Sequence, residues 1–223
     1  MERRDAAETT QENPMTDSDS VAADLRAEIA GEYRELADLL ESSPDSVWDV
    51  PSLCEGWRTR EVVAHVTMPA RYGVPEFMAE MEAAGGDFTR LSNTIAERDG
   101  ALPPTTLLAD LRSETLHAWE PPGGGQQGAL THAVIHGLDV TEAAALGRTV
   151  PARRMAPVLA SADPAVFGLD LSGVELRADD LEWSYGSGEV VAGPAQVLAL
   201  VVCGRTVPAG RLHGPAAERF MAR

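Results

Sequence analysis

The chain has 223 residues, of which 44% are hydrophobic and 24% are charged, which is enough to bury one good core, or one core and a small second domain. Its 35 acidic residues outnumber its 18 lysines and arginines and give a formal net charge of -17. Such a surface repels phosphate backbones and anionic lipid headgroups, and no basic cluster interrupts it, so composition argues against nucleic-acid and membrane partners. No apolar run reaches the length of a membrane span.

The start of the chain and the cysteines indicate a cytoplasmic protein. Residues 1–20 are polar and charged without an apolar centre, which predicts a disordered leader rather than a secretory signal. Cys54 and Cys203 lie far apart and form no paired motif. Neither a disulfide framework nor a thiolate zinc site is therefore expected.

The first part of the chain shows the pattern of packed helices. Apolar residues recur at spacings of three and four over residues 21–41, which predicts an amphipathic helix. Residues 48–56 form a connecting loop that is apolar enough to pack on its neighbours. Thr59 is a good N-cap residue for a second helix, which carries His65.

Three further segments complete a predicted bundle. The polar segment 90–98 is expected to be helical, and a clearer third helix begins near Thr105 and stops before Pro121. A fourth helix covers residues 127–146, with an apolar stripe along one side. Four main helices with long connections predict a helical bundle over residues 21–150.

The pattern changes after residue 150. Apolar and polar residues alternate over 174–178 and again over 181–185, and Gly186-Ser187-Gly188 follows as a turn. This predicts a small antiparallel sheet. An apolar helix over 195–202 comes next, so residues 151–223 are expected to form a small α+β domain.

Two histidines occur four residues apart in the fourth predicted helix, at His132 and His136. At that spacing both side chains leave the same face and can bind one metal ion. His65 from the second helix would complete an open three-histidine site with a free position for water or substrate. The alternative is that these are core histidines whose ring nitrogens are satisfied by hydrogen bonds. Spacing alone leaves both interpretations open.

Longer motifs resemble a known family. Residues 51–65, Pro-Ser-Leu-Cys-Glu-Gly-Trp-Arg-Thr-Arg-Glu-Val-Val-Ala-His, and the later His136-Gly137-Leu138-Asp139 resemble the two signatures of the maleylpyruvate isomerase family of mycothiol-dependent enzymes. Segments within residues 176–205 resemble its small C-terminal domain. The resemblance implies an α+β chain, with a DinB-like four-helix bundle at 21–150 followed by a small α+β domain.

The resemblance also implies the metal ligands. They are His65, His132 and His136, and zinc is the first divalent metal to expect. The family often has glutamate where this chain has His132; a neutral ligand there leaves more positive charge on the metal and favours thiolate binding. Asp139 either orients a ligand ring by a hydrogen bond or is an ordinary exposed aspartate.

The function implied by the resemblance is a metal-dependent isomerase or thiol transferase that uses mycothiol as cosubstrate. The metal would activate the thiolate for attack on a small electrophile. The alternative is a non-catalytic metal-binding DinB-like bundle. A mycothiol enzyme further implies an actinobacterial source, a small-molecule thiol and an electrophile as partners, and a monomer or homodimer.

Other candidate residues have weaker support. Arg205 and Arg211 are candidates for binding a substrate carboxylate. Cys54 is interpreted as structural because it has no basic neighbour in the sequence that would lower its pKa. His117 and His213 lack a partner at ligand spacing and are expected to be ordinary packing or surface residues.

Overall fold

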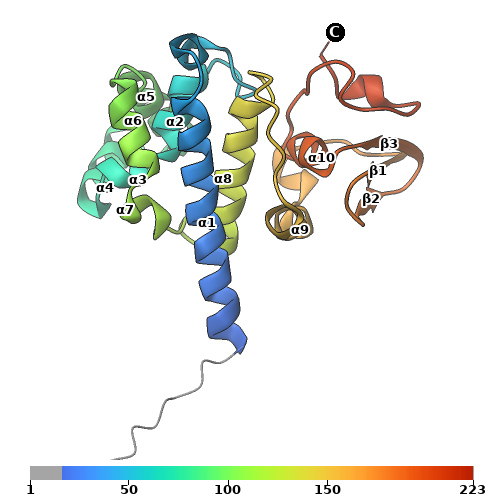
Figure 1. Ribbon diagram of the computed structural model, residues 1–223, viewed down its shortest axis with the longest axis horizontal. Helices are drawn as coiled ribbons and strands as arrows, with labels where there is room; N and C mark the ends of the chain where they lie inside the picture. Colours follow the sequence, from blue (N-terminus) through green and yellow to red (C-terminus); the bar gives the residue numbers. More distant parts are fainter. Residues whose placement is uncertain (1–16, 223) are drawn as a thin grey trace, which may run out of the picture.

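The computed structural model describes residues 17–222, and the structural statements below concern this range. A helical bundle lies beside a smaller part made of helices and a sheet (Figure 1). Among the described residues, none of the helices combines the length and the apolarity that crossing a bilayer requires.

The bundle part is built mainly from α-helices. They are α1 (Asp17–Glu41), α2 (Thr59–Val66), α3 (Met68–Arg71), α4 (Val74–Ala83), α5 (Phe88–Asp99), α6 (Pro104–Leu111), α7 (Glu114–His117) and α8 (Gly125–Thr141), with a 3-10 helix η1 (Asp45–Asp49) after α1. The long helices α1 and α8 lie side by side, and α2 packs against α8 and α5 (Figure 1).

Helix α1 confirms the predicted first helix. Ile29, Tyr33, Leu36 and Leu40 are each at most 2% exposed, so the three-and-four spacing does mark the buried face. The helix begins at Asp17, so the prediction of a disordered leader is wrong for residues 17–20; the rest of that leader lies outside the described residues.

Several predicted boundaries are wrong for local reasons. The predicted third helix is divided into α6 and α7, because the chain turns before Ser113 and the Ser113 side chain then accepts a hydrogen bond from the Thr115 amide. The fourth helix, α8, ends at Thr141 rather than at residue 146. Ala145 and Gly147 have positive φ values of 51° and 67° there, a conformation that no α-helix continues.

The second part of the chain follows. It contains α9 (Ala152–Ser161), η2 (Pro164–Phe167), β1 (Val174–Ala178), β2 (Ser184–Gly186), β3 (Glu189–Gly193), α10 (Ala195–Val202) and η3 (Ala217–Arg219). Helices α4 and α9 and strand β3 were not predicted from the sequence. The two helices have ten residues each and the strand has five, and helix and strand are hard to tell apart in such short apolar segments.

The sheet is mixed, so the prediction of a purely antiparallel sheet is wrong. The strand order is β2-β1-β3, in which β1 pairs antiparallel with β2 and parallel with β3. The turn at 186–188 therefore carries the chain around the start of β1 instead of closing a hairpin. A Cβ atom on Gly188 would lie 2.1 Å from the Gly173 oxygen, so only glycine fits this crossing.

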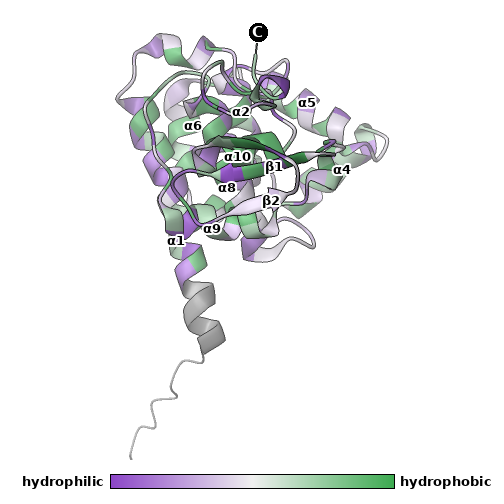
Figure 2. Cartoon of the chain, turned by 90° about the vertical axis from the view of Figure 1, so that its right-hand side faces the viewer, coloured by the Kyte–Doolittle hydropathy of each residue, from purple (hydrophilic) through white to green (hydrophobic). Residues whose placement is uncertain are grey.

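Helix α10 joins the two parts. All eight of its residues are buried, and it contacts α8, α9, β1 and β3; Figure 2 shows it as a hydrophobic element beside the sheet. One continuous buried cluster includes residues from α1, α2 and α8 as well as from β1 and α10. The division into domains at residue 150 stays a prediction, and both parts share this core.

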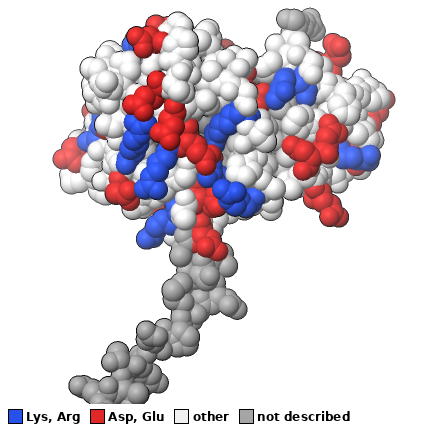
Figure 3. Space-filling view, viewed as in Figure 1, with Lys and Arg blue, Asp and Glu red and all other residues white. Residues whose placement is uncertain are grey.

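The charged side chains do not separate into patches of one sign on the face shown in Figure 3, where acidic and basic residues lie next to each other. Many are paired across elements, as Arg112 is with Asp38 at 2.7 Å. On this face the acidic residues are therefore interspersed with basic ones, in agreement with the absence of a basic binding patch in the sequence.

Candidate metal centre and adjoining cavity

Three histidines converge where α2 packs on α8. His65 lies in the last turn of α2, and His132 and His136 lie one turn apart on α8. One possible ligand atom from each lies within 4.8 Å of the others, and the Nε2 atoms of His65 and His132 are 3.3 Å apart. The structure thus brings together the three residues that the sequence motifs single out.

The Nδ1 atoms of two of these rings face hydrogen-bonding partners. His65 Nδ1 lies 2.9 Å from the hydroxyl of Ser92, which is on α5. His136 Nδ1 lies 3.0 Å from Oδ2 of Asp139, a residue with no exposed surface. Asp139 is therefore not an exposed aspartate. With both Nδ1 atoms protonated, the Nε2 atoms keep their lone pairs for a ligand.

The arrangement fits a divalent metal. Two nitrogens bound to tetrahedral zinc at about 2.0–2.1 Å lie roughly 3.3 Å apart, which is the distance found between the His65 and His132 Nε2 atoms. Without a cation, this contact requires that one of the two Nε2 atoms carry a proton and donate it to the other. His132 Nδ1 is also buried without a hydrogen-bond partner, so the interpretation of satisfied core histidines does not describe this ring.

The protonation states also suit metal binding. Burial, helped by the nearby His136, lowers the pKa of His65 to about 3. Burial lowers the pKa of His132 well below its ordinary value too, and the other two histidines add to the shift. Both imidazoles are therefore neutral at pH 7, which is the form that binds metals.

Asp139, Arg205 and Cys54 form a second polar cluster, which contacts His136 at its Nδ1 atom. Arg205 donates to both carboxylate oxygens of Asp139, from Nε at 2.8 Å and from Nη2 at 3.0 Å. The thiol of Cys54 donates to Asp139 Oδ2 at 2.9 Å. Burial raises the pKa of Asp139, but hydrogen bonds from His136 and Arg205 outweigh it and hold this pKa far below its usual range. Asp139 is therefore a carboxylate fixed on three sides.

Cys54 is not set up as a nucleophile. Burial and the charge of Asp139 raise its pKa strongly, in spite of the opposing charge of Arg205. Cys54 has no basic neighbour in the sequence, whereas the fold places Arg205 Nη2 3.4 Å from its sulfur. Cys54, His136 and Asp139 are close enough to bind a cation, but a guanidinium already contacts two of them, so we assign this trio to hydrogen-bonded support.

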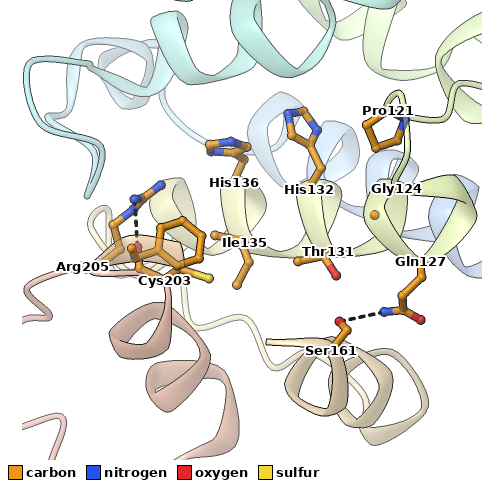
Figure 4. Close-up of a pocket in the computed structure, with 12 residues that line it drawn as sticks. Pro121, Gly124, Gln127, Thr131, His132, Ile135, His136, Ser161, Cys203 and Arg205 are labelled. Atoms are coloured by element: carbon orange, nitrogen blue, oxygen red, sulfur yellow. Dashed lines mark hydrogen bonds between the residues drawn. The ribbon is translucent and has the colours of Figure 1, made fainter. Parts of the chain in front are cut away.

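A cavity of about 460 Å³ opens beside the histidines, between α8 and the C-terminal part. Figure 4 shows His132 and His136 side by side on α8, with Arg205 beyond His136 and with Gln127 joined to Ser161 at the other end. A space of this size is ordinary for a small-molecule site. Two of the three predicted ligands, His132 and His136, therefore lie at the wall of a pocket.

The remaining candidates lie elsewhere. His117 is 3% exposed, and its Nε2 lies 2.9 Å from the Leu111 carbonyl oxygen. His213 is exposed and pairs with Asp179. Arg211 does not line the cavity and pairs with Glu142 at 2.9 Å. Both histidines are thus packing and surface residues, as expected.

Sequence reasoning missed two neighbours of the site. Ser92 lies in a polar segment with no motif, and only its buried position on α5 beside His65 reveals its part. Trp119 has its ring centroid 5.4 Å from that of His132, and it belongs to a connection rather than to the predicted helix. Amphipathic phasing of residues 88–99 puts Ser92 next to Leu91 and Ile95 on the buried side, which is the one signal that the sequence contained.

Two comparisons with known proteins found similarities. Residues 29–120 match the model of the mycothiol maleylpyruvate isomerase N-terminal domain. This part of the chain is therefore similar to that domain. The matched region contains His65 and Ser92, whereas His132 and His136 follow it. No curated protein matches the sequence significantly.

Two solved structures share the fold. They are the mycothiol-dependent maleylpyruvate isomerase and a histidine-to-alanine mutant of it; each aligns with a TM-score of 0.53 and 17% identity over 89% of this chain and 93% of theirs. The likeness confirms the predicted fold class, a helical bundle followed by a small α+β part. At this identity the likeness shows the fold.

Proposed function

We propose that this protein is a zinc-dependent enzyme that uses a small-molecule thiol, mycothiol, against a small electrophile, as an isomerase or a thiol transferase. The observation that supports this most directly is the convergence of three imidazoles beside a cavity that His132 and His136 line, with the Nε2 atoms of His65 and His132 3.3 Å apart. The choice of mycothiol as the thiol is supported by the similarity of residues 29–120 to the mycothiol maleylpyruvate isomerase N-terminal domain.

The proposed ligands are His65, His132 and His136. A zinc ion bound there would supply the positive charge that lets a thiol lose its proton near pH 7. Ser92 fixes the ring of His65, and Asp139 fixes that of His136, so both rings keep their orientation without metal. Arg205 balances the charge of Asp139. The ring centroid of Trp57 lies 5.0 Å from that of His65, and the ring centroid of Trp119 lies 5.4 Å from that of His132. In this proposal the two indole rings limit the access of water to the metal.

The reaction itself needs only the thiol and the electrophile. In an isomerisation the sulfur adds to one carbon of a conjugated double bond, the resulting single bond rotates, and the sulfur leaves again with its electron pair. In a transfer the sulfur displaces a leaving group, which departs with the electrons of the broken bond. The proton of the thiol passes to solvent, because the Cys54 thiol keeps its own proton and the histidines serve as ligands.

The test is metal content followed by thiol binding. We expect about one zinc per wild-type chain by elemental analysis, and background metal in His65→Ala, His132→Ala and His136→Ala. His213→Ala is the matched control, because His213 is exposed and remote from the cavity. Calorimetry of the zinc-loaded and zinc-free wild type with mycothiol then measures whether the thiol binds only when metal is present.

The outcomes separate the possibilities. No metal in the wild type after reconstitution with zinc would overturn the proposal. Metal without any binding of mycothiol would indicate a non-catalytic metal-binding bundle. Metal lost equally in His213→Ala would mean that the measurement reports general unfolding, and thermal unfolding curves of each variant decide that point.

A further inference from the structure

We propose that the cavity beside the histidines takes an uncharged, mostly apolar electrophile rather than a dicarboxylate, and that Phe167 is the side chain that sets this preference. This inference rests on the proposed function, because it concerns the electrophile that the thiol attacks. It is argued from the charges and walls of the cavity.

The one arginine or lysine that lines the cavity is already paired. Of the five N–H donors of Arg205, two bind the Asp139 carboxylate, one binds the Cys203 carbonyl oxygen at 3.2 Å and one points to the Cys54 sulfur. Asp139 has no exposed surface, so its charge cannot be left to water. A substrate carboxylate that took Arg205 would remove the guanidinium from the buried Asp139, which would keep only its contacts with Cys54 and His136, and this loss is costly.

The other walls offer little to an anion. Pro121, Ile135 and Phe167 supply apolar surface. Gln127 uses its amide N–H groups on the Pro157 carbonyl oxygen and on Ser161 Oγ, and Ser161 donates in turn to the Val158 carbonyl oxygen. These amide and hydroxyl groups are satisfied within the protein, and Thr131 adds one hydroxyl that has no hydrogen-bond partner. Apart from the proposed metal, a dianion would lose its hydration here without gaining charged donors.

The charge of the whole chain acts in the same direction. The formal net charge of -17 gives a negative field around the protein, which lowers the encounter rate of a dianion and leaves that of a neutral molecule unchanged. The long-range field and the local walls therefore favour the same class of substrate.

Phe167 lies where it can contact a substrate in the cavity. It ends η2, lines the cavity and keeps 49% of its surface exposed, so it is a partly exposed apolar wall rather than part of the core. The adjacent Val166 is 73% exposed and does not line the cavity, which makes it a matched control.

Diethyl maleate and maleate are suitable probes, because they share a carbon skeleton and differ in charge. In both, the thiol adds across the double bond: sulfur bonds to one carbon, the π bond breaks, and a proton is taken up at the other carbon. Rates with zinc-loaded wild type and mycothiol are each divided by the rate with mycothiol alone. We expect this enhancement to be at least about tenfold larger for diethyl maleate.

Two arginine substitutions test the part played by Phe167. Phe167→Arg places an unpaired cation at the cavity, and we expect it to lower the preference for diethyl maleate by about tenfold or more. Val166→Arg adds the same charge next to the cavity wall and is expected to change the preference by no more than about twofold. Equal effects of the two substitutions would overturn the role of Phe167.

A binding measurement keeps this inference separate from the proposed function. Saturation-transfer NMR of the wild type, with and without zinc, reports whether each probe binds. If no thiol reaction occurs but diethyl maleate binds, and this binding is lost in Phe167→Arg and kept in Val166→Arg, the proposed function fails and the inference holds. Maleate binding or reacting at least as well as diethyl maleate overturns the inference, as does an absence of diethyl maleate binding.

Discussion

Two polar clusters contact α8, and they differ in whether their charges are balanced by partners within the protein. Between α1, α9 and the loop before α9, the residues Glu28, Glu32, Glu35, Arg148, Arg153 and Arg154 form an ionic cluster, with three acids against three arginines. The histidine cluster of His65, His132 and His136 instead holds three imidazoles whose nitrogens face one another. Charges that balance within the protein indicate a structural role, whereas converging imidazole nitrogens, with His132 Nδ1 buried and unpaired, fit a set of metal ligands.

The two clusters are one residue apart on α8. Gly137 follows His136, and a Cβ atom on it would lie 3.0 Å from Arg148 Nη1 and 3.1 Å from Glu32 Oε1. Glycine at this position lets the ionic cluster reach the helix backbone on one side while the histidines face α2 on another. The comparison therefore predicts that damage to one cluster lowers stability and damage to the other lowers metal affinity.

The largest expected effect is on stability. Arg154 is 2% exposed and donates to Glu28, Glu32 and Glu35. Arg154→Met leaves buried carboxylates short of a partner and should lower the free energy of unfolding by about 3 kcal/mol. Chemical denaturation measures this loss, and zinc content of the folded variant should stay at the wild-type level.

Arg153 provides the control for this prediction. It contacts Glu28 at 2.5 Å, but its side chain is 62% exposed, so Arg153→Met should cost less than about 1 kcal/mol. A loss of zinc in Arg154→Met, measured under conditions where it is folded, would contradict the separation of the two clusters.

The second effect is on metal affinity. Ser92→Ala removes the hydroxyl 2.9 Å from His65 Nδ1, so the ring loses the partner that fixes its orientation. Zinc affinity should fall by about tenfold, as measured by competition with a chelator. Thr94→Ala on the same helix is the control, because the Thr94 side chain is exposed and bonds only to the Arg90 carbonyl oxygen. Equal affinity in Ser92→Ala and wild type would show that Ser92 plays no part.

The sequence predicted what depends on local pattern. The period of α1 follows from its apolar residues, and the spacing of His132 and His136 fixes their shared face on α8. The mixed sheet was not predictable in this way, because strand pairing depends on which strands meet in space; the short β3 flanks β1 although the turn at 186–188 resembles a hairpin.

The residues that hold the candidate metal ligands in place could not be predicted from the sequence either. Arg205 lies 66 residues from Asp139 along the chain, and Ser92 lies 27 residues from His65. The sequence suggested Arg205 as a partner for a substrate carboxylate, whereas the fold gives it a carboxylate of the protein. Motifs therefore located the ligands, and only the packing of α5 and the C-terminal part revealed which groups hold them.

The smallest expected effect is a pH dependence of the stability that the ionic cluster contributes. Burial raises the pKa of Glu28, but hydrogen bonds from Arg154 and Arg153 outweigh it and lower this pKa; a hydrogen bond from Arg154 lowers that of Glu35. Both carboxylates thus bind protons less readily in the folded chain than in the unfolded one. Their contribution to stability is complete above the unfolded pKa of about 4.3 and is lost as the pH falls through the lower folded values.

The difference in unfolding free energy between wild type and Arg154→Met should therefore narrow, by about 1 kcal/mol, between pH 6 and pH 3. Zinc-free protein is used at both pH values, so that metal release does not contribute. Leu36→Ala is the control: Leu36 is 2% exposed and apolar, so the cost of the cavity that this substitution leaves is the same at both pH values. If the difference in unfolding free energy between wild type and Arg154→Met stays constant down to pH 3, Arg154 stabilises the fold by the packing of its side chain rather than by its charge.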